Sequence, residues 1–214
     1  MRVDERRVDQ SPPSPADELA QLESLLEMHG VEVERWGKGS AKSLEDLVAE
    51  FDLGECTLLC DEGGRLVREV AVVGVDVFFT DRQCGALRLV ESEQTFRSGR
   101  KRHRKLRTSI AEKRLPGESA ADAAKRAIAE ELGLPAEDLE LLLSGSEITA
   151  GSSCSFPGLW SRRRLTYFQC ELPSVLFECK GYVERQPDKT THFSWQPAAS
   201  SDKEDKESYA LSTS

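Results

Sequence analysis

The hydrophobic positions follow a helical spacing near the start of the chain and a strand pattern after it. Residues 16–28, ADELAQLESLLEM, place four leucines on one helical face, and His29-Gly30 ends the segment. A second short helix is predicted over residues 43–51. We therefore expect an N-terminal helical segment over residues 16–54.

From Cys56 onward, runs rich in Val, Leu and Phe alternate with turn residues, which is typical of strands. EGG at residues 62–64 and TDRQCG at residues 80–85 are the first predicted turns. The expected strands are residues 56–60, 66–80, 85–96, 106–114, 139–143, 163–172, 175–183 and 191–197.

One alanine-rich helix separates these strands, within LPGESAADAAKRAIAEELGL at residues 115–134. Ser119 can cap its start, and Gly133 can end it. At about 100° per residue, the expected buried stripe is Ala121, Ala124, Ile128 and Leu132. Strands on both sides of a central helix predict an α/β sandwich, in which helices cover a mixed sheet.

Composition adds limits to this picture. The chain has 214 residues and a net charge of −9, so one domain with tails is expected, and its field repels polyanions. No segment approaches the roughly 20 apolar residues that span a bilayer, which predicts a soluble, cytoplasmic protein and leaves the nucleus open. The six cysteines form no C-x-x-C pair, so reduced, mostly buried thiols are expected.

The two ends of the chain differ from its middle. Residues 1–15 and 200–214 are dominated by charged and small polar residues, with prolines near the start, and they are predicted to be disordered. The remaining boundaries place the helical segment at residues 16–54 and the α/β domain at residues 55–199.

Two adjacent carboxylates, Glu130 and Glu131, end the alanine-rich helix. They repel each other and lie at the negative end of the helix dipole. An arbitrary pair of this kind is solvated helix surface. A divalent cation is the alternative, since Mg²⁺ prefers one or two carboxylates together with substrate phosphates.

The spacing around this pair resembles the Nudix box, G-x5-E-x7-R-E-U-x-E-E-x-G-U, where U is aliphatic. The match runs through Glu118, Arg126, Ile128, Glu130, Glu131, Gly133 and Leu134, within a box at residues 112–134. The resemblance implies a Nudix-like α/β/α sandwich. It also implies that Glu130 and Glu131 bind Mg²⁺ or Mn²⁺, and that Glu118 and Arg126 form an ion pair that braces the loop before the helix.

Two positions depart from the box. Glu112 stands where the first glycine belongs, and Ala127 stands where the family has a glutamate that binds metal or helps to activate water. The site is then one carboxylate short. Glu112 and Glu147 are candidate replacements, and changing Ala127 to glutamate should raise the rate of a competent site.

By resemblance, the reaction is hydrolysis of a nucleoside diphosphate joined to another group. A bound Mg²⁺ or Mn²⁺ screens the phosphate charge and lowers the pKa of water, while a carboxylate takes its proton. The candidate catalytic residues are Glu130, Glu131 and Glu112. The expected ligand is a nucleotide-type small molecule.

A basic segment, RSGRKRHRKLR at residues 97–107, precedes the box. It can attract an anionic substrate, and Arg100, Arg102 and Arg104 are the candidate phosphate ligands. It can also be an RNA-binding or nuclear-import patch, or a solvated loop balanced by neighbouring acids. Later in the chain, Phe156 or Trp160 can stack on a base as part of a lid, or can pack a turn against the core.

Three hypotheses follow. The first is a metal-dependent Nudix-type hydrolase of the pyrophosphate linkage, which the Glu130-Glu131 pair favours. The second is a weakened or inactive Nudix-fold module that binds a nucleotide, RNA or a protein, which Ala127 favours. The third is an RNA-associated module led by the basic segment. The sequence does not name the substrate or the oligomeric state.

Overall fold

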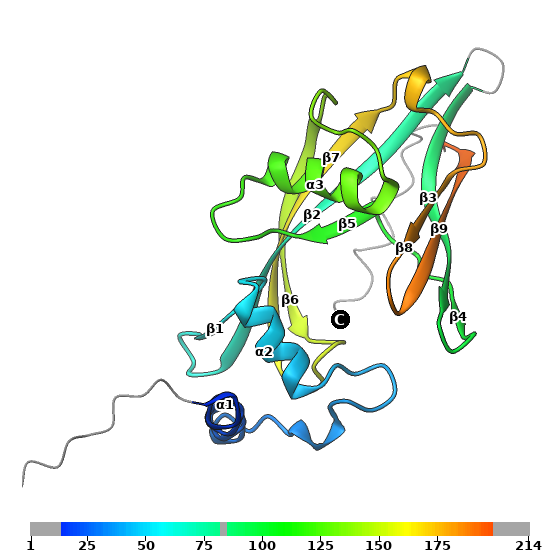
Figure 1. The fold of residues 1–214 in the computed structure, drawn as a ribbon. Helices are drawn as coiled ribbons and strands as arrows, with labels where there is room; N and C mark the ends of the chain where they lie inside the picture. The colour runs from blue at the N-terminus through cyan, green and yellow to red at the C-terminus, as the bar shows by residue number, and fades with distance from the viewer. Residues whose placement is uncertain (1–13, 82–84, 199–214) are drawn as a thin grey trace, which may run out of the picture. The chain divides into compact units, whose positions relative to one another are not determined.

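The computed structural model describes residues 14–81 and 85–198. Contacts divide these residues into two compact units, whose elements are labelled in Figure 1. The N-terminal unit contains the described residues up to Ala71 together with Ile148–Arg164, and the box unit contains Val72–Glu147 and the described residues from Leu165 onward. Strands β2 (Leu66–Asp81), β6 (Leu142–Ser152) and β7 (Trp160–Glu171) contribute residues to both.

Two serine-capped helices open the N-terminal unit. α1 spans Pro15–Met28 and α2 spans Leu44–Asp52, which confirms both predicted helices. In each, the serine before the helix accepts a hydrogen bond from the backbone of an aspartate three residues on, and that aspartate accepts one from the serine N–H. A short 3₁₀ helix, η1 (Val33–Arg35), and strand β1 (Thr57–Cys60) complete the region. The predicted tails lie outside the described residues, apart from Ser14 and Pro15 at the start of α1.

Large side chains fill the core of the N-terminal unit. Leu26 and Leu47 are fully buried, and Trp36 packs on Phe156 with ring centroids 5.0 Å apart. Glu50 and Arg68 form a buried ion pair beside them. Phe156 is 0% exposed, so of its two expected roles the ring packs against the core and does not form a lid.

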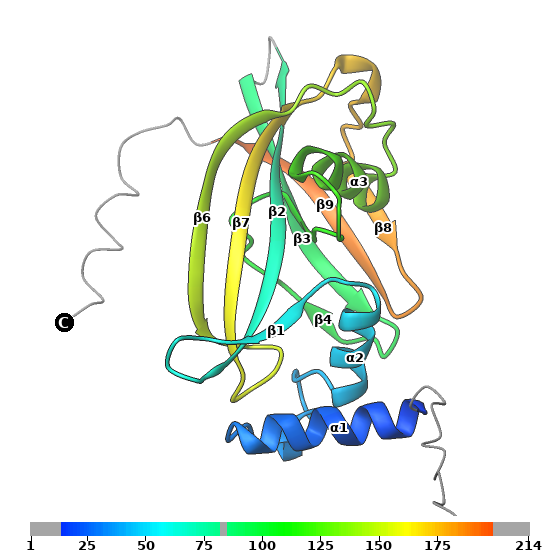
Figure 2. The same cartoon turned by 90° about the vertical axis from the view of Figure 1, so that its left-hand side faces the viewer.

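The strands form a sheet in the order β6-β7-β2-β3-β9-β8. In Figure 1 the arrows of β2 and β7 point the same way, whereas β3 pairs antiparallel with both β2 and β9, so the sheet is mixed. Figure 2 shows β6, β7 and β2 as neighbours. The other strands are β3 (Gly85–Phe96), β4 (Lys101–Arg102), β5 (Ile110–Lys113), β8 (Tyr182–Arg185) and β9 (Lys189–Pro197).

The box helix, α3 (Ala120–Leu132), packs on this sheet and contacts β5 and β8. Its core partners include Val73, Ile110 and Phe193. The predicted stripe was partly wrong, because Ala121 is exposed whereas Ala127 is fully buried. The buried positions of α3 are Ala123, Ala124, Ala127, Ile128 and Leu132. The predicted α/β class with N-terminal helices is confirmed.

Two predicted strands were placed incorrectly. LELLL, residues 139–143, overlaps β6 only at its end, and β6 continues through small and polar residues to Ser152. Residues 175–183 contain the end of a 3₁₀ helix, η2 (Ser174–Leu176), and a turn before β8 begins. Gly181 closes that turn with φ of 78°, and a Cβ there would lie 1.9 Å from the Phe193 carbonyl oxygen, so only glycine fits.

The described cysteines are free thiols, as predicted, but most are not buried. Cys60, Cys154 and Cys179 are exposed, whereas Cys56 and Cys170 are buried. Within residues 14–81 and 85–198, none of the helices combines the length and the apolar character needed to cross a membrane.

Candidate active site

Caps at both ends hold α3 in place. The Ser119 hydroxyl accepts a hydrogen bond from the Asp122 N–H at 3.1 Å, as the sequence predicts for an N-cap. Gly133 ends the helix in the left-handed conformation, with φ of 68°. These local signals fix where the last helical turn lies, and therefore where Glu130 and Glu131 stand.

The predicted ion pair between Glu118 and Arg126 is present. The Arg126 guanidinium donates to both carboxylate oxygens of Glu118, at 2.9 and 3.1 Å, and to the Lys113 carbonyl at 2.7 Å. Glu118 also accepts the Leu115 N–H at 2.9 Å. The Arg126 hydrogen bond lowers the pKa of Glu118, and its counterpart raises the pKa of Arg126. One side chain thus joins α3 to the end of β5 and to the loop between them.

The two helix-end glutamates have different environments. Glu130 is exposed, and its carboxylate accepts a hydrogen bond from Arg126 at 3.2 Å, one helical turn back. Glu131 is half-buried, and its Oε1 atom is buried with no hydrogen-bond partner among the described residues. Glu130 and Glu131 look equivalent in the sequence pattern, but the fold gives them different environments.

Burial and neighbouring acids make the Glu131 carboxylate hard to ionise. Burial is the largest cause that raises its pKa to about 8, followed by the charges of Glu184, Glu112 and Glu91. Arg104 acts in the opposite direction. The carboxylates come from separate elements of one unit, since Glu112 lies on β5, Glu91 on β3 and Glu184 on β8.

These residues fit a divalent cation chemically, although the described residues hold no ready-made cluster of three or more His, Cys, Asp or Glu that could bind one. A buried carboxylate oxygen without a donor is the feature that a hard cation would satisfy. Glu112 is half-buried and accepts the Lys113 N–H at 2.7 Å.

The three predicted phosphate ligands lie in different places. Arg104 binds Glu91 and lines a pocket of about 380 Å³. Arg102 donates to the Gln94 side chain at 2.6 Å, and Arg100 lies 4.4 Å from the Phe96 ring centroid. Only Arg104 of the three lines this pocket, which is formed by Val90, Glu91, Arg104, Lys105, Leu106, Thr108 and Gln196.

Glu147 belongs to the other face of the sheet. It accepts a hydrogen bond from the Tyr167 hydroxyl at 2.6 Å and pairs with Arg107 at 2.7 Å. Phe168, which follows Tyr167 on β7, belongs to the core under α3. Neighbouring strand residues point to opposite faces, so Tyr167 and its partner Glu147 lie on the face away from α3. Glu112 is therefore the replacement candidate that the structure brings to Glu131.

Sequence reasoning missed Glu91 and Glu184. Both sit in strands without any motif, and only the pairing of β3, β9 and β8 brings them to α3. Alternation along β3 is the one available signal, since Glu91 follows the core residue Leu89 by two positions.

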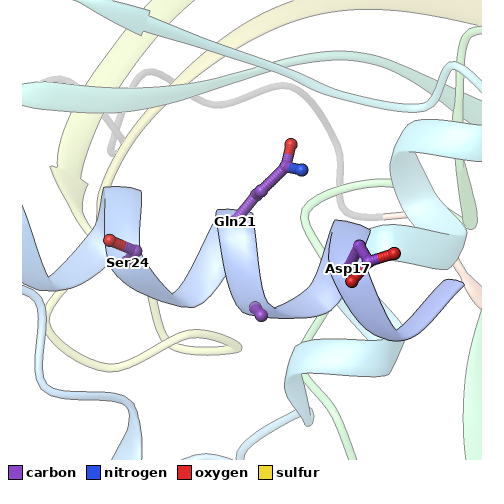
Figure 3. Close-up of a pocket in the computed structure, with 4 residues that line it drawn as sticks. Asp17, Gln21 and Ser24 are labelled. Atoms are coloured by element: carbon purple, nitrogen blue, oxygen red, sulfur yellow. The ribbon is translucent and has the colours of Figure 1, made fainter. Parts of the chain in front are cut away.

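A second hollow lies on α1 and is unlike this site. Figure 3 shows Asp17, Gln21 and Ser24 along one side of the helix, and together with Ala20 they line a hollow of about 470 Å³. Asp17, its one carboxylate, is already bound to Ser14 in the helix cap. This surface offers no paired carboxylates for a cation.

Comparison with known proteins decides the family. The family model described as NUDIX domain matches residues 70–210, well over half of the chain. This chain belongs to the Nudix family. A search of curated proteins finds no match to it.

Several solved Nudix-type structures are similar in fold. They include the Ap4A hydrolase of C. elegans, with 14% identity, 58% of this chain and 77% of that chain covered, and a TM-score of 0.34. The E. coli dihydroneopterin triphosphate pyrophosphohydrolase has 18% identity, coverage of 58% and 78%, and a TM-score of 0.36. A MutT/nudix family protein from Enterococcus faecalis has 10% identity, coverage of 86% and 56%, and a TM-score of 0.42. Similarity this low transfers no activity to the chain.

Ala127 is a position of the Nudix box that departs from the family pattern and lies in the hydrophobic core. Ala127 is 0% exposed and belongs to the hydrophobic cluster between α3 and the sheet. The position one turn before Glu131 therefore contributes packing and no oxygen atom. The carboxylates of Glu184, Glu112 and Glu91, which act on Glu131 electrostatically, all come from strands.

Proposed function

We propose that this Nudix protein hydrolyses the pyrophosphate linkage of a nucleoside-diphosphate-linked compound with the help of Mg²⁺ or Mn²⁺. The observation that carries the proposal is Glu131, a carboxylate with a buried, unpartnered oxygen at the end of the Nudix box. Carboxylates on three strands act on it electrostatically. Such a group is most readily satisfied by a cation that also meets a phosphate.

Glu131 and Glu130 are the residues that would hold the cation. Glu130 is exposed, and one of its two carboxylate oxygens accepts a hydrogen bond from Arg126. When bound, a divalent cation neutralises phosphate charge and lowers the pKa of water. The fit rests on the hard oxygen donors and on the unpartnered Glu131 oxygen.

The remaining roles belong to side chains of the box unit. Arg104 and Lys105 line the pocket and attract the phosphates, since guanidinium and ammonium groups both bind phosphate oxygens. A carboxylate accepts the proton of the attacking water as the new P–O bond forms and the bridging P–O bond breaks. We assign that proton transfer to Glu112, whose charge reaches both Glu131 and Arg126.

A second candidate function is nucleotide binding without turnover. Buried Ala127 favours it, because the box lacks one of the three glutamates that the family pattern places on this helix. The pocket and its cations would serve binding equally well.

Product release from a panel of dinucleotide and sugar-nucleotide substrates separates the two functions. With Mn²⁺ or Mg²⁺ present, hydrolysis predicts phosphate or nucleotide release that chelation abolishes. No release across the panel, together with saturable nucleotide binding, would establish the second function and reject the first.

A further inference from the structure

One buried ion pair borders the proposed site. Arg104 Nε donates to Glu91 Oε1 at 2.9 Å, and its terminal nitrogen donates to Glu91 Oε2, so both carboxylate oxygens are occupied. Gln94 Nε2 adds a third donor at 3.3 Å. The Glu91 side chain is 1% exposed, whereas that of Arg104 is 36% exposed.

The pair reaches both the acidic side chains and the pocket. Glu91 and Arg104 each act on the Glu131 carboxylate, with opposite signs. Both also line the 380 Å³ pocket, next to Lys105 and Thr108. The hydrogen bond to Glu91 is the largest cause that raises the pKa of Arg104, so this arginine remains charged.

A carboxylate held at both oxygens by a guanidinium is poorly able to bind a divalent cation. The same guanidinium fork fits two oxygens of a phosphate group, and the Arg104 side chain is 36% exposed, so a phosphate can reach it. Phosphate and Glu91 therefore compete for Arg104, while Arg104 and a divalent cation compete for Glu91.

We propose that Arg104 is a switch that couples phosphate binding to cation binding. Without substrate it occupies Glu91, and a substrate phosphate in the pocket takes the guanidinium and releases the Glu91 carboxylate to a divalent cation at Glu131. Glu91 thereby supplies the oxygen ligand that Ala127 cannot. The inference rests on the proposed cation and phosphate site and does not depend on turnover.

Mn²⁺ binding in the absence of any nucleotide tests the switch. Arg104→Gln frees Glu91, so calorimetric titration should show about tenfold tighter Mn²⁺ binding than in the unaltered protein, within the usual range for coupled sites. Arg107→Gln is the matched control, because it also breaks an arginine–glutamate pair and removes one charge, but its partner Glu147 lies on the other sheet face. Its Mn²⁺ affinity should stay within about twofold.

The double variant Glu91→Gln/Arg104→Gln separates the switch from a general effect of charge. It leaves no unpaired carboxylate at position 91, so it should fold even where Arg104→Gln alone is unstable. The switch predicts that its Mn²⁺ affinity returns to about the unaltered value or below it. Tight Mn²⁺ binding in the double variant would overturn the proposal, because the gain would not pass through Glu91.

Inorganic pyrophosphate, titrated without metal, tests the other half of the switch. Arg104→Gln should weaken its binding about tenfold, and unchanged binding would show that phosphate does not take the guanidinium. Metal-dependent hydrolysis with Mn²⁺ affinity unchanged by Arg104→Gln would reject the switch and leave the proposed function intact. If the variants show the predicted changes in Mn²⁺ and pyrophosphate binding but no substrate is hydrolysed, the switch would be retained and the proposed hydrolase function rejected. A protein that binds no Mn²⁺ in any variant would reject both.

Discussion

Of the two carboxylates at the end of α3, Glu131 is the one that the fold partly buries, whereas Glu130 is exposed. Burial raises its pKa to about 8 from the ordinary 4.5, so the folded protein retains a proton that an unfolded glutamate has lost. The free energy of unfolding of the metal-free protein should therefore decrease as pH rises from about 4.5 to about 8. The glutamine of Glu131→Gln cannot titrate. The thermal midpoint of this variant minus that of the unaltered protein should therefore increase between about pH 5 and pH 8 and then level off. A difference that is constant across this range would contradict the assigned environment.

Ala127 occupies a box position where the family pattern has a glutamate, and in this chain it is packed in the core. Ala127→Glu should restore a box carboxylate and raise the hydrolysis rate, but it adds a large side chain at a position that is 0% exposed. Overpacking of this kind costs about 1–3 kcal/mol of unfolding free energy, measured by urea denaturation. Mn²⁺ should recover stability in Ala127→Glu and not in the isosteric control Ala127→Gln. Equal recovery in the two variants, or no gain in rate, would count against the account.

At the scale of elements, Arg126 joins the box helix to the chain before it. Arg126→Ala removes hydrogen bonds to Glu118, Glu130 and the Lys113 carbonyl, so we expect a loss of about 2–3 kcal/mol in unfolding free energy. Arg126→Lys keeps the charge without the fork and should recover less than half. The ion pair lowers the pKa of Glu118, so the loss should shrink as pH falls below about 4.5. A loss under about 0.5 kcal/mol at neutral pH would show that the brace is unimportant.

Elements with local signals could be predicted from the sequence, and those fixed by tertiary contacts could not. The Ser119 cap and the Gly133 stop lie in the segment itself, so the limits of α3 agree closely with prediction. The second half of β6 has small and polar residues that carry no strand pattern, and sheet pairing forms it. The same holds for the site, since the box identifies Glu131, but sheet order alone brings Glu91 to it.

At the scale of the whole molecule, charge argues against the RNA hypothesis. The chain carries a net charge of −9, and three of the seven Lys and Arg residues of the basic segment are in ion pairs, Lys101 with Glu93, Arg104 with Glu91 and Arg107 with Glu147. Fluorescence anisotropy with a single-stranded RNA should therefore show binding weaker than about 10⁻⁴ M at physiological salt. Glu93→Gln/Glu147→Gln, which frees two cations, should bind RNA more tightly. Salt-sensitive micromolar binding by the unaltered protein would favour the RNA-associated module.

The central claim is that the Nudix box of this chain holds a divalent cation through Glu131. The most direct test is anomalous scattering from crystals grown with Mn²⁺ and a non-hydrolysable nucleoside diphosphate. The account predicts a Mn²⁺ peak within bonding distance of a Glu131 carboxylate oxygen and of a phosphate oxygen. A fully occupied nucleotide with no metal peak at Glu131 would contradict it.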